Sequence, residues 1–107
     1  MENRSYEIIY RFKHENGNIL QEVKYIDIPE SSPKSSRYKW FLLKNGALKP
    51  LTFLSQNGTT RSFVEGTLTI YPEYCLFNGE NYSQQNVSLP IVYSAEFYFH
   101  GIMNRTE

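Results

Sequence analysis

The sequence has very little that could serve a disulfide, a membrane span or a secretion signal. Cys75 is the single cysteine among 107 residues, so no disulfide can form within the chain. No apolar run approaches the roughly 20 residues that a membrane-spanning helix needs. Residues 1–13 have neither the basic start nor the apolar stretch of a signal peptide. We therefore expect a globular protein of the cytoplasm that does not enter a membrane.

Groups for catalysis and for cofactors are also scarce. The two histidines, His14 and His100, lie far apart in the sequence, and no pair of cysteines or histidines has the spacing of metal ligands. There is one aspartate, no Gly-x-Ser-x-Gly motif, and no glycine cluster that could hold a phosphate. Cys75 has no neighbouring Lys, Arg or His to lower its pKa, which favours a buried, unreactive thiol. We expect no enzyme activity, no metal and no cofactor.

The sequence shows no helical periodicity. Instead, apolar and polar residues alternate with a period of two. Tyr6, Ile8, Tyr10 and Phe12 alternate with mostly polar residues, which predicts a strand with one apolar face. Asn-Gly, the pair that best adopts the positive φ of hairpin turns, occurs four times. The predicted strands cover residues 6–13, 19–28, 37–44, 47–54, 61–71, 74–77 and 89–99. A short helix within residues 80–88 is the only helical alternative.

These patterns predict the fold class and the number of domains. We expect an all-β protein, an antiparallel β-sandwich or partly closed barrel of about seven strands built from Asn-Gly hairpins. Residues 29–37 are rich in proline and serine, a composition typical of an exposed loop. The residues before this loop form at most one hairpin, which is marginal alone in water. Residues 1–107 are therefore expected to form a single domain.

Positive charge is missing from most of the second half of the chain. The formal net charge is zero, with 11 basic and 11 acidic groups, which disfavours a general nucleic-acid binder. Residues 1–61 carry a net charge of +4 and residues 62–107 a net charge of −4, and no Lys or Arg occurs between Ser62 and Asn104. Nine tyrosines and seven phenylalanines are more aromatic groups than a small core readily hides. Some tyrosines should therefore lie at the surface.

Tyrosine and glutamate occur together in this acidic half, a combination suited to binding a basic protein. The residues expected to contact the partner are Glu73, Tyr74, Glu80, Tyr82, Glu96 and Tyr98. We expect a small inhibitor without chemistry of its own that covers the active surface of its target. Bacterial immunity proteins, which neutralise a cognate toxin such as a nuclease, have this profile. Neither nucleic acid nor a membrane is expected as a partner, whereas pairing of exposed edge strands between two copies would give a homodimer.

Two alternatives depend on other residues. A barrel could bind a small ligand, a sugar or single-stranded nucleic acid, with inward-facing Tyr and Trp side chains as stacking walls. Residues 37–41 interleave basic and aromatic groups as single-strand binders do, although alternation puts Trp40 in the core and the basic pair at its rim. The other alternative is an enzyme that uses His14 and His100 as acid and base on RNA.

Overall fold

The computed structural model describes residues 5–87 and 91–93. This part of the chain is all-β apart from one helical turn, and every strand pair in it is antiparallel. The elements are β1 (Ser5–His14), β2 (Ile19–Tyr25), α1 (Lys34–Arg37), β3 (Tyr38–Lys44), β4 (Ala47–Pro50), β5 (Phe53–Asn57), β6 (Thr60–Phe63), β7 (Gly66–Ile70), β8 (Tyr74–Phe77), β9 (Glu80–Gln84) and β10 (Ile91–Tyr93).

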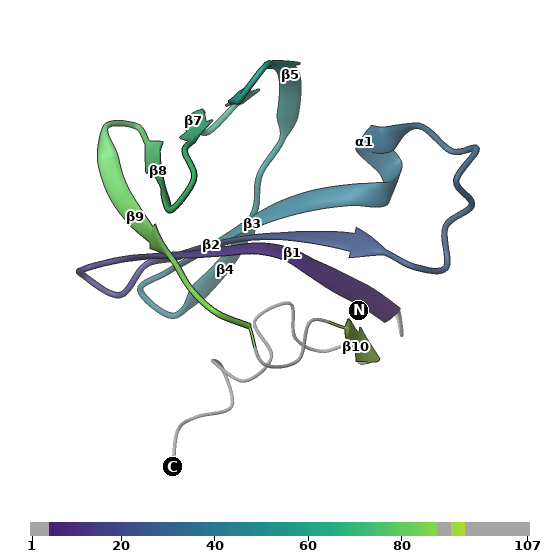
Figure 1. The fold of residues 1–107 in the computed structure, drawn as a ribbon, viewed down its shortest axis with the longest axis horizontal. Helices are drawn as coiled ribbons and strands as arrows, with labels where there is room; N and C mark the ends of the chain where they lie inside the picture. Colours follow the sequence, from purple (N-terminus) through teal and green to yellow (C-terminus); the bar gives the residue numbers. More distant parts are fainter. Residues whose placement is uncertain (1–4, 88–90, 94–107) are drawn as a thin grey trace.

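The strands form one continuous sheet that curls into a half-barrel (Figure 1). Their order is β4-β3-β2-β1-β9-β8-β7-β6-β5, and β10 pairs with β1 beside this path. β4 and β5 follow one another in the sequence yet occupy opposite ends of the order. The short connection between them is bonded to both ends, because the Leu51 N–H donates to the Trp40 carbonyl and the Thr52 carbonyl accepts from the Val64 N–H, each at 2.9 Å. This connection draws the two ends of the sheet toward each other.

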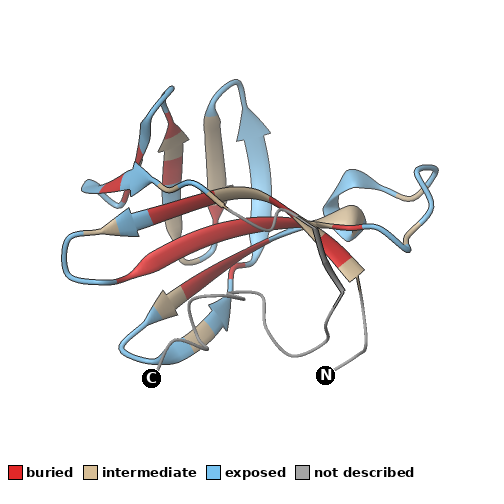
Figure 2. Cartoon of the chain, turned by 60° about the horizontal axis from the view of Figure 1, so that its bottom comes forward, coloured by how far each residue is buried: buried red, intermediate tan, exposed pale blue. Residues whose placement is uncertain are grey.

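Buried side chains gather in two clusters, one on each face of the sheet. The inner cluster, inside the curl, contains Phe12, Leu20, Trp40, Leu42, Leu51, Phe63, Leu68, Ile70, Cys75, Phe77 and Tyr82. The outer cluster lies against β1, β2 and β3 and contains Tyr6, Ile8, Ile19, Val23, Tyr25 and Phe41. Burial is therefore concentrated in β1, β2 and the middle of β3, whereas β5 is exposed along its whole length (Figure 2). The expected core position of Trp40 is confirmed.

The expectation that β1 has a single apolar face is wrong. The register between β1 and β2 shifts between Ile8 and Tyr10, where β1 holds one extra residue. An extra residue reverses the alternation of side chains from that point onward. Ile8 therefore belongs to the outer cluster, whereas Tyr10 packs against the inner cluster and Phe12 is part of it.

The described residues contain ten strands, more than the seven or so expected. Residues 47–57 are divided at Leu51 and Thr52, where the chain crosses from one end of the sheet to the other. The helix considered as an alternative within residues 80–88 does not form in the described part, residues 80–87. Asn78 and Gly79 both have positive φ, 53° and 83°, and turn the chain back along β8 as β9. Of the strand expected at residues 89–99, the described part is β10.

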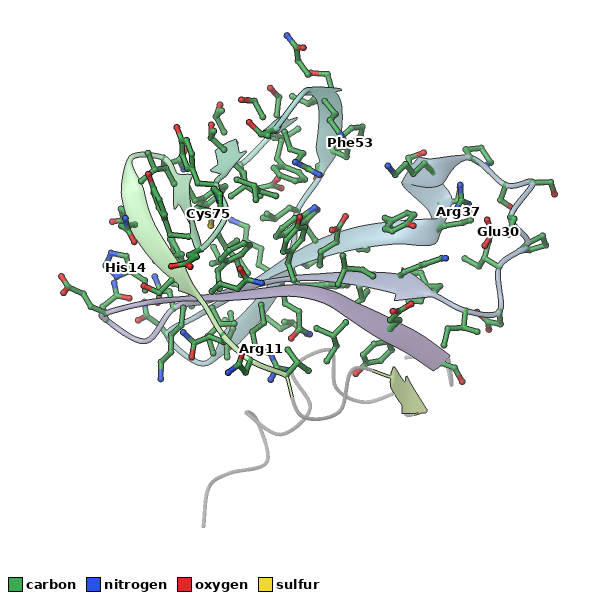
Figure 3. All side chains as sticks on the ribbon, in the orientation of Figure 1. Arg11, His14, Glu30, Arg37, Phe53 and Cys75 are labelled. Carbon is green, nitrogen blue, oxygen red and sulfur yellow. The ribbon has the colours of Figure 1, made fainter. Side chains whose placement is uncertain are left out.

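The proline- and serine-rich segment is exposed over most of its length and ends in α1, a single helical turn after Pro33. Arg37 folds back over this segment. Its Nε donates to the Ser32 carbonyl at 3.1 Å, and its Nη1 lies 3.8 Å from a carboxylate oxygen of Glu30 (Figure 3). These contacts hold α1 next to the start of β3.

Candidate ligand-binding site

The half-barrel has a pocket of about 370 Å³ at the seam where its two ends approach each other. One side is formed by β2, β3 and α1, and the other by the β4–β5 connection, β5 and β6. The lining residues are Glu22, Lys34, Ser35, Tyr38, Lys39, Trp40, Pro50, Leu51, Thr52, Phe53, Gln56, Arg61 and Phe63. The pocket therefore exists only because the sheet curls, since its two sides come from opposite ends of the strand order.

A carboxyl group lies on the inner wall of this pocket. Glu22 is directly opposite Trp40 in the antiparallel pairing of β2 with β3, and only 7% of its surface is exposed. The indole N–H of Trp40 favours the ionised form of the Glu22 carboxyl. Glu22 follows Leu20 on the inner face of β2, so the regular alternation of the strand directs this polar group into the interior.

Aromatic rings form much of the remaining wall. Trp40 stacks on Tyr10 with ring centroids 6.0 Å apart, and Phe63 meets Trp40 edge-on at 6.2 Å. Phe53 meets Phe63 edge-on at 6.0 Å and keeps 44% of its surface exposed. In Figure 3, Phe53 on β5 and Arg37 at the end of α1 lie on the same side of β1 and β2. Phe53 thus stands at the pocket mouth, while Trp40 and Phe63 are buried behind it.

The electrostatics of the pocket are dominated by the buried carboxyl. Burial raises the pKa of Glu22 to about 7, and the positive charges of Arg61 and Lys34 oppose this rise. Glu22 consequently changes charge near neutral pH, unlike an exposed glutamate. Around Tyr38, which lines the same pocket, the charged groups of Lys24, Lys34 and Arg37 lie between 5.3 and 5.9 Å from the ring centroid.

Tyr74, one of the residues predicted to contact a partner, forms an exposed stacked pair with Tyr71. The rings of Tyr71 and Tyr74 stack with centroids 4.8 Å apart, and each residue keeps over a third of its surface exposed. Glu73 lies in the exposed turn between them. Glu80 is also exposed, but it is opposite Phe77 in the pairing of β8 with β9, at the other end of this hairpin. The structure therefore does not bring Glu73 and Glu80 together.

Tyr82 is not a surface residue, which corrects the expectation that it contacts a partner. It lies opposite Cys75 on the inner face of the β8–β9 hairpin, with 1% of its surface exposed. Its ring packs against Phe77 and His14. Glu96 and Tyr98 lie outside the described residues, as does His100. The predicted partner surface is thus reduced to Tyr74 and Glu73 at one end of the hairpin and Glu80 at the other.

The groups considered for catalysis are separated from the pocket. Cys75 is fully buried, as expected, and burial raises the pKa of its thiol to about 12. His14 ends β1, where its Nδ1 accepts the Asn16 N–H at 3.1 Å, and it lines a second pocket together with Glu80 and Lys13. Within residues 5–87 and 91–93, no three His, Cys, Asp or Glu side chains are grouped as a metal site would require. Over the same residues, no helix combines the length and apolar character needed to cross a membrane.

Only part of this pocket was considered as a site from the sequence, since Tyr38, Lys39 and Trp40 lie within residues 37–41. Glu22, Phe53 and Arg61 were not identified. The signal for Glu22 was present, since it is a carboxyl that shares the inner face of β2 with Leu20. Its partners could not be found in the same way, because Phe53 and Arg61 come from strands that only the curl of the sheet brings near. No family model, curated protein or solved structure matches the chain. The interpretation of the site therefore depends on its own geometry.

Proposed function

We propose that the protein is a binding module, without a chemical step of its own, that holds a small organic ligand in the pocket at the seam of the half-barrel. The observation that carries this proposal is the position of Glu22, a carboxyl with 7% exposure on the wall of a 370 Å³ cavity that four aromatic residues also line. Pockets of this size, mostly apolar with a few polar groups, are typical of small-molecule sites.

The energetic cost of the carboxyl supports a role in binding. An ionised group removed from water destabilises the folded state unless its charge is compensated, and an apolar side chain of similar size would avoid this cost. Glu22 has no carboxylate-to-cation contact within 4 Å among the described residues, and its pKa is accordingly raised to about 7. A group of perturbed pKa in a cavity is a recognised mark of a functional site.

The test uses Trp40, the single tryptophan of the chain, which lines the pocket. An apolar fluorescent dye is titrated into the protein, and energy transfer from Trp40 reports its binding. Replacing Phe53→Ser removes an aromatic ring from the pocket mouth and is expected to weaken dye binding about tenfold. The matched control is Leu54→Ser, because Leu54 is the next residue, is 60% exposed and does not line the pocket. Equal loss in both variants, or no dye binding, would contradict the proposal.

A second candidate is a cytoplasmic inhibitor of a basic protein, of the immunity-protein class. It is favoured by the exposed Tyr71–Tyr74 stack beside Glu73, in the part of the chain without Lys or Arg. Rigid aromatic area next to a carboxylate suits recognition of a basic surface. Of the residues predicted for this surface, Glu73, Tyr74 and Glu80 remain exposed.

This candidate is tested by purifying the tagged protein from its host at low and at high salt. A stoichiometric basic polypeptide that binds at low salt and is released at high salt is expected. Glu73→Lys should abolish this binding, whereas Asp27→Lys, an exposed charge reversal on another loop, should not. Glu80→Lys is tested separately, since Glu80 lies at the other end of the hairpin. Equal binding by wild type and Glu73→Lys would exclude this surface.

A further inference from the structure

The rim of the pocket has an excess of positive charge. Lys34, Lys39 and Arg61 line it, and no carboxylate in the described ranges lies within ion-pair distance of their charged groups. Lys24 and Arg37, which surround Tyr38, differ in this respect, because both pair with Glu30, at 3.5 and 3.8 Å. The charges of Lys34 and Arg61 act on Glu22 without forming an ion pair with it, and cations at the mouth of a cavity attract an anionic ligand.

The walls indicate the shape of that ligand. Phe53 presents an exposed ring at the mouth, and Trp40 and Phe63 continue the aromatic surface inward. Flat rings of this kind bind planar heteroaromatic groups by stacking. A cavity of about 370 Å³ is near the lower end of small-molecule sites, so it suits one flat ring and its substituent.

Glu22 indicates which hydrogen-bonding groups the ring carries. An ionised carboxylate only accepts hydrogen bonds, and the indole N–H of Trp40 favours this form of Glu22. The remaining acceptor capacity suits a ring bearing N–H groups, and carboxylates recognise the exocyclic amino group of cytosine in this way. Inside the same pocket, the chain therefore combines a stacking wall, an acceptor for ring N–H groups and cations for a negative charge.

We propose that the pocket binds a nucleotide, with its base between the aromatic wall and Glu22 and its phosphate toward Lys34 and Arg61. This inference rests on the proposed function, because it requires the pocket to be a ligand site. A base with its phosphate occurs both as a free mononucleotide and within single-stranded nucleic acid. The pocket chemistry is shared by these two sources, and the experiment distinguishes them.

The experiment follows Trp40 fluorescence at about pH 8, where Glu22 is ionised. Cytidine 5′-monophosphate, cytidine and a cytidine hexanucleotide are titrated in separate arms. The monophosphate is expected to bind at least about tenfold more tightly than cytidine at low salt, and the ratio should shrink at high salt because the phosphate contacts are screened. Uridine 5′-monophosphate should bind more weakly than the cytidine nucleotide, since uracil presents an oxygen where cytosine presents an amino group.

Variants assign these effects to residues. Lys34→Gln and Arg61→Gln should each bring the affinity ratio of nucleotide to nucleoside toward one, and Glu22→Gln should reduce the preference for cytosine over uracil. Lys44→Gln is the matched control, because Lys44 is exposed at the other end of β3 and does not line the pocket. The control should leave all ratios unchanged.

Each outcome separates this inference from the proposed function. Tighter binding of the hexanucleotide than of the monophosphate supports a single strand as the source, and equal binding supports the free nucleotide. Equal affinity for cytidine and its monophosphate overturns the nucleotide inference. If the apolar dye binds and no nucleotide does, the pocket remains a ligand site and only this inference fails. If neither binds, both proposals fail.

Discussion

The β1–β2 hairpin buries two ionisable side chains, Arg11 and Glu22, on opposite faces of the sheet, and their surroundings differ. Arg11 faces outward with 8% of its surface exposed, and its Nε donates to Gln21 Oε1 at 2.6 Å. Figure 3 shows Arg11 on the opposite side of β1 from Cys75. Glu22 faces inward with 7% exposed, lies opposite Trp40 in the sheet and borders a cavity. The two side chains are thus about equally buried, but Arg11 lies in a packed polar contact and Glu22 lies on a pocket wall.

The pKa shifts of the two groups follow from the same cause but have different consequences. Burial lowers the pKa of Arg11 from its usual 12.5, but an arginine remains charged at any physiological pH. Burial raises the pKa of Glu22 to about 7, so its charge depends on conditions that cells reach. Burial alone therefore does not mark a functional group. The cavity beside Glu22, and its pKa near neutrality, distinguish it from Arg11.

Among the substitutions that test this comparison, Glu22→Gln is expected to change the free energy of unfolding most. A raised pKa means that the folded state binds the proton more tightly than the unfolded state, so the contribution of Glu22 to stability is fully present below its usual pKa of 4.5 and is lost as pH rises through about 7. Glutamine does not ionise, so the variant does not lose stability in this way as pH rises. Urea unfolding should therefore find the variant more stable than wild type by up to about 3 kcal/mol at pH 8 and similar at pH 4. A variant less stable at pH 8 would show that the carboxylate is well compensated.

A smaller effect of opposite sign is expected for Arg11→Met. The substitution keeps an extended apolar stem but leaves the buried Gln21 Oε1 without its donor. Unfolding in urea should show a loss of about 2 kcal/mol that does not depend on pH between 5 and 8. Lys13→Met, on the exposed part of β1, is the control and should change little. The double variant Arg11→Met with Gln21→Leu should recover part of the loss, because both buried polar partners are then removed. If Arg11→Met does not lower the free energy of unfolding, the contrast between Arg11 and Glu22 is wrong.

The smallest effect is expected for Glu65, a glutamate that is the exposed counterpart of Glu22. The Thr52 N–H donates to the Glu65 carboxylate at 2.7 Å and the Thr52 hydroxyl lies at 3.1 Å, which lowers the pKa of Glu65. A lowered pKa contributes stability above pH 4.5 that is lost as pH falls, opposite to Glu22. Glu65→Gln should lower the melting temperature only slightly at pH 7, because water screens the interaction, and the difference should shrink as pH falls and the carboxylate is protonated. Glu15→Gln, in an exposed turn, is the control. A difference that does not shrink as pH falls would contradict this account.

Part of this structure was predictable from local sequence. The alternation and the Asn-Gly pairs predicted an all-β chain, because both act over a few residues. The burial of Trp40 followed from the alternation, and that of Cys75 from the lack of neighbouring Lys, Arg or His. The face that each strand turns inward was harder to predict. One extra residue near Ile9 reverses the alternation of β1, and no composition signal marks it. Tyr82 was misjudged because Tyr and Glu occur together in and around its hairpin, and their co-occurrence does not say which face meets the core.

The pocket could not be predicted because it depends on the register and the curl. Glu22 belongs to the pocket wall because it lies opposite Trp40. The register between β2 and β3 sets this position, and the exposed loop and α1 separate the two strands in the sequence. Phe53 and Arg61 come from the far end of the strand order. The spacing of neighbouring residues does not predict long-range arrangements of this kind.

The strand order also has a consequence for how the chain folds. Among the described strands, every pairing joins consecutive strands except those of β1 with β9 and with β10. The segments β1–β4 and β5–β9 can each assemble through short-range hairpins, but Phe12 meets Gln84 only after some seventy intervening residues have been brought into place. Contacts so distant in sequence slow folding. We therefore expect stopped-flow refolding to be limited by the joining of two independently formed meanders along the β1–β9 pair.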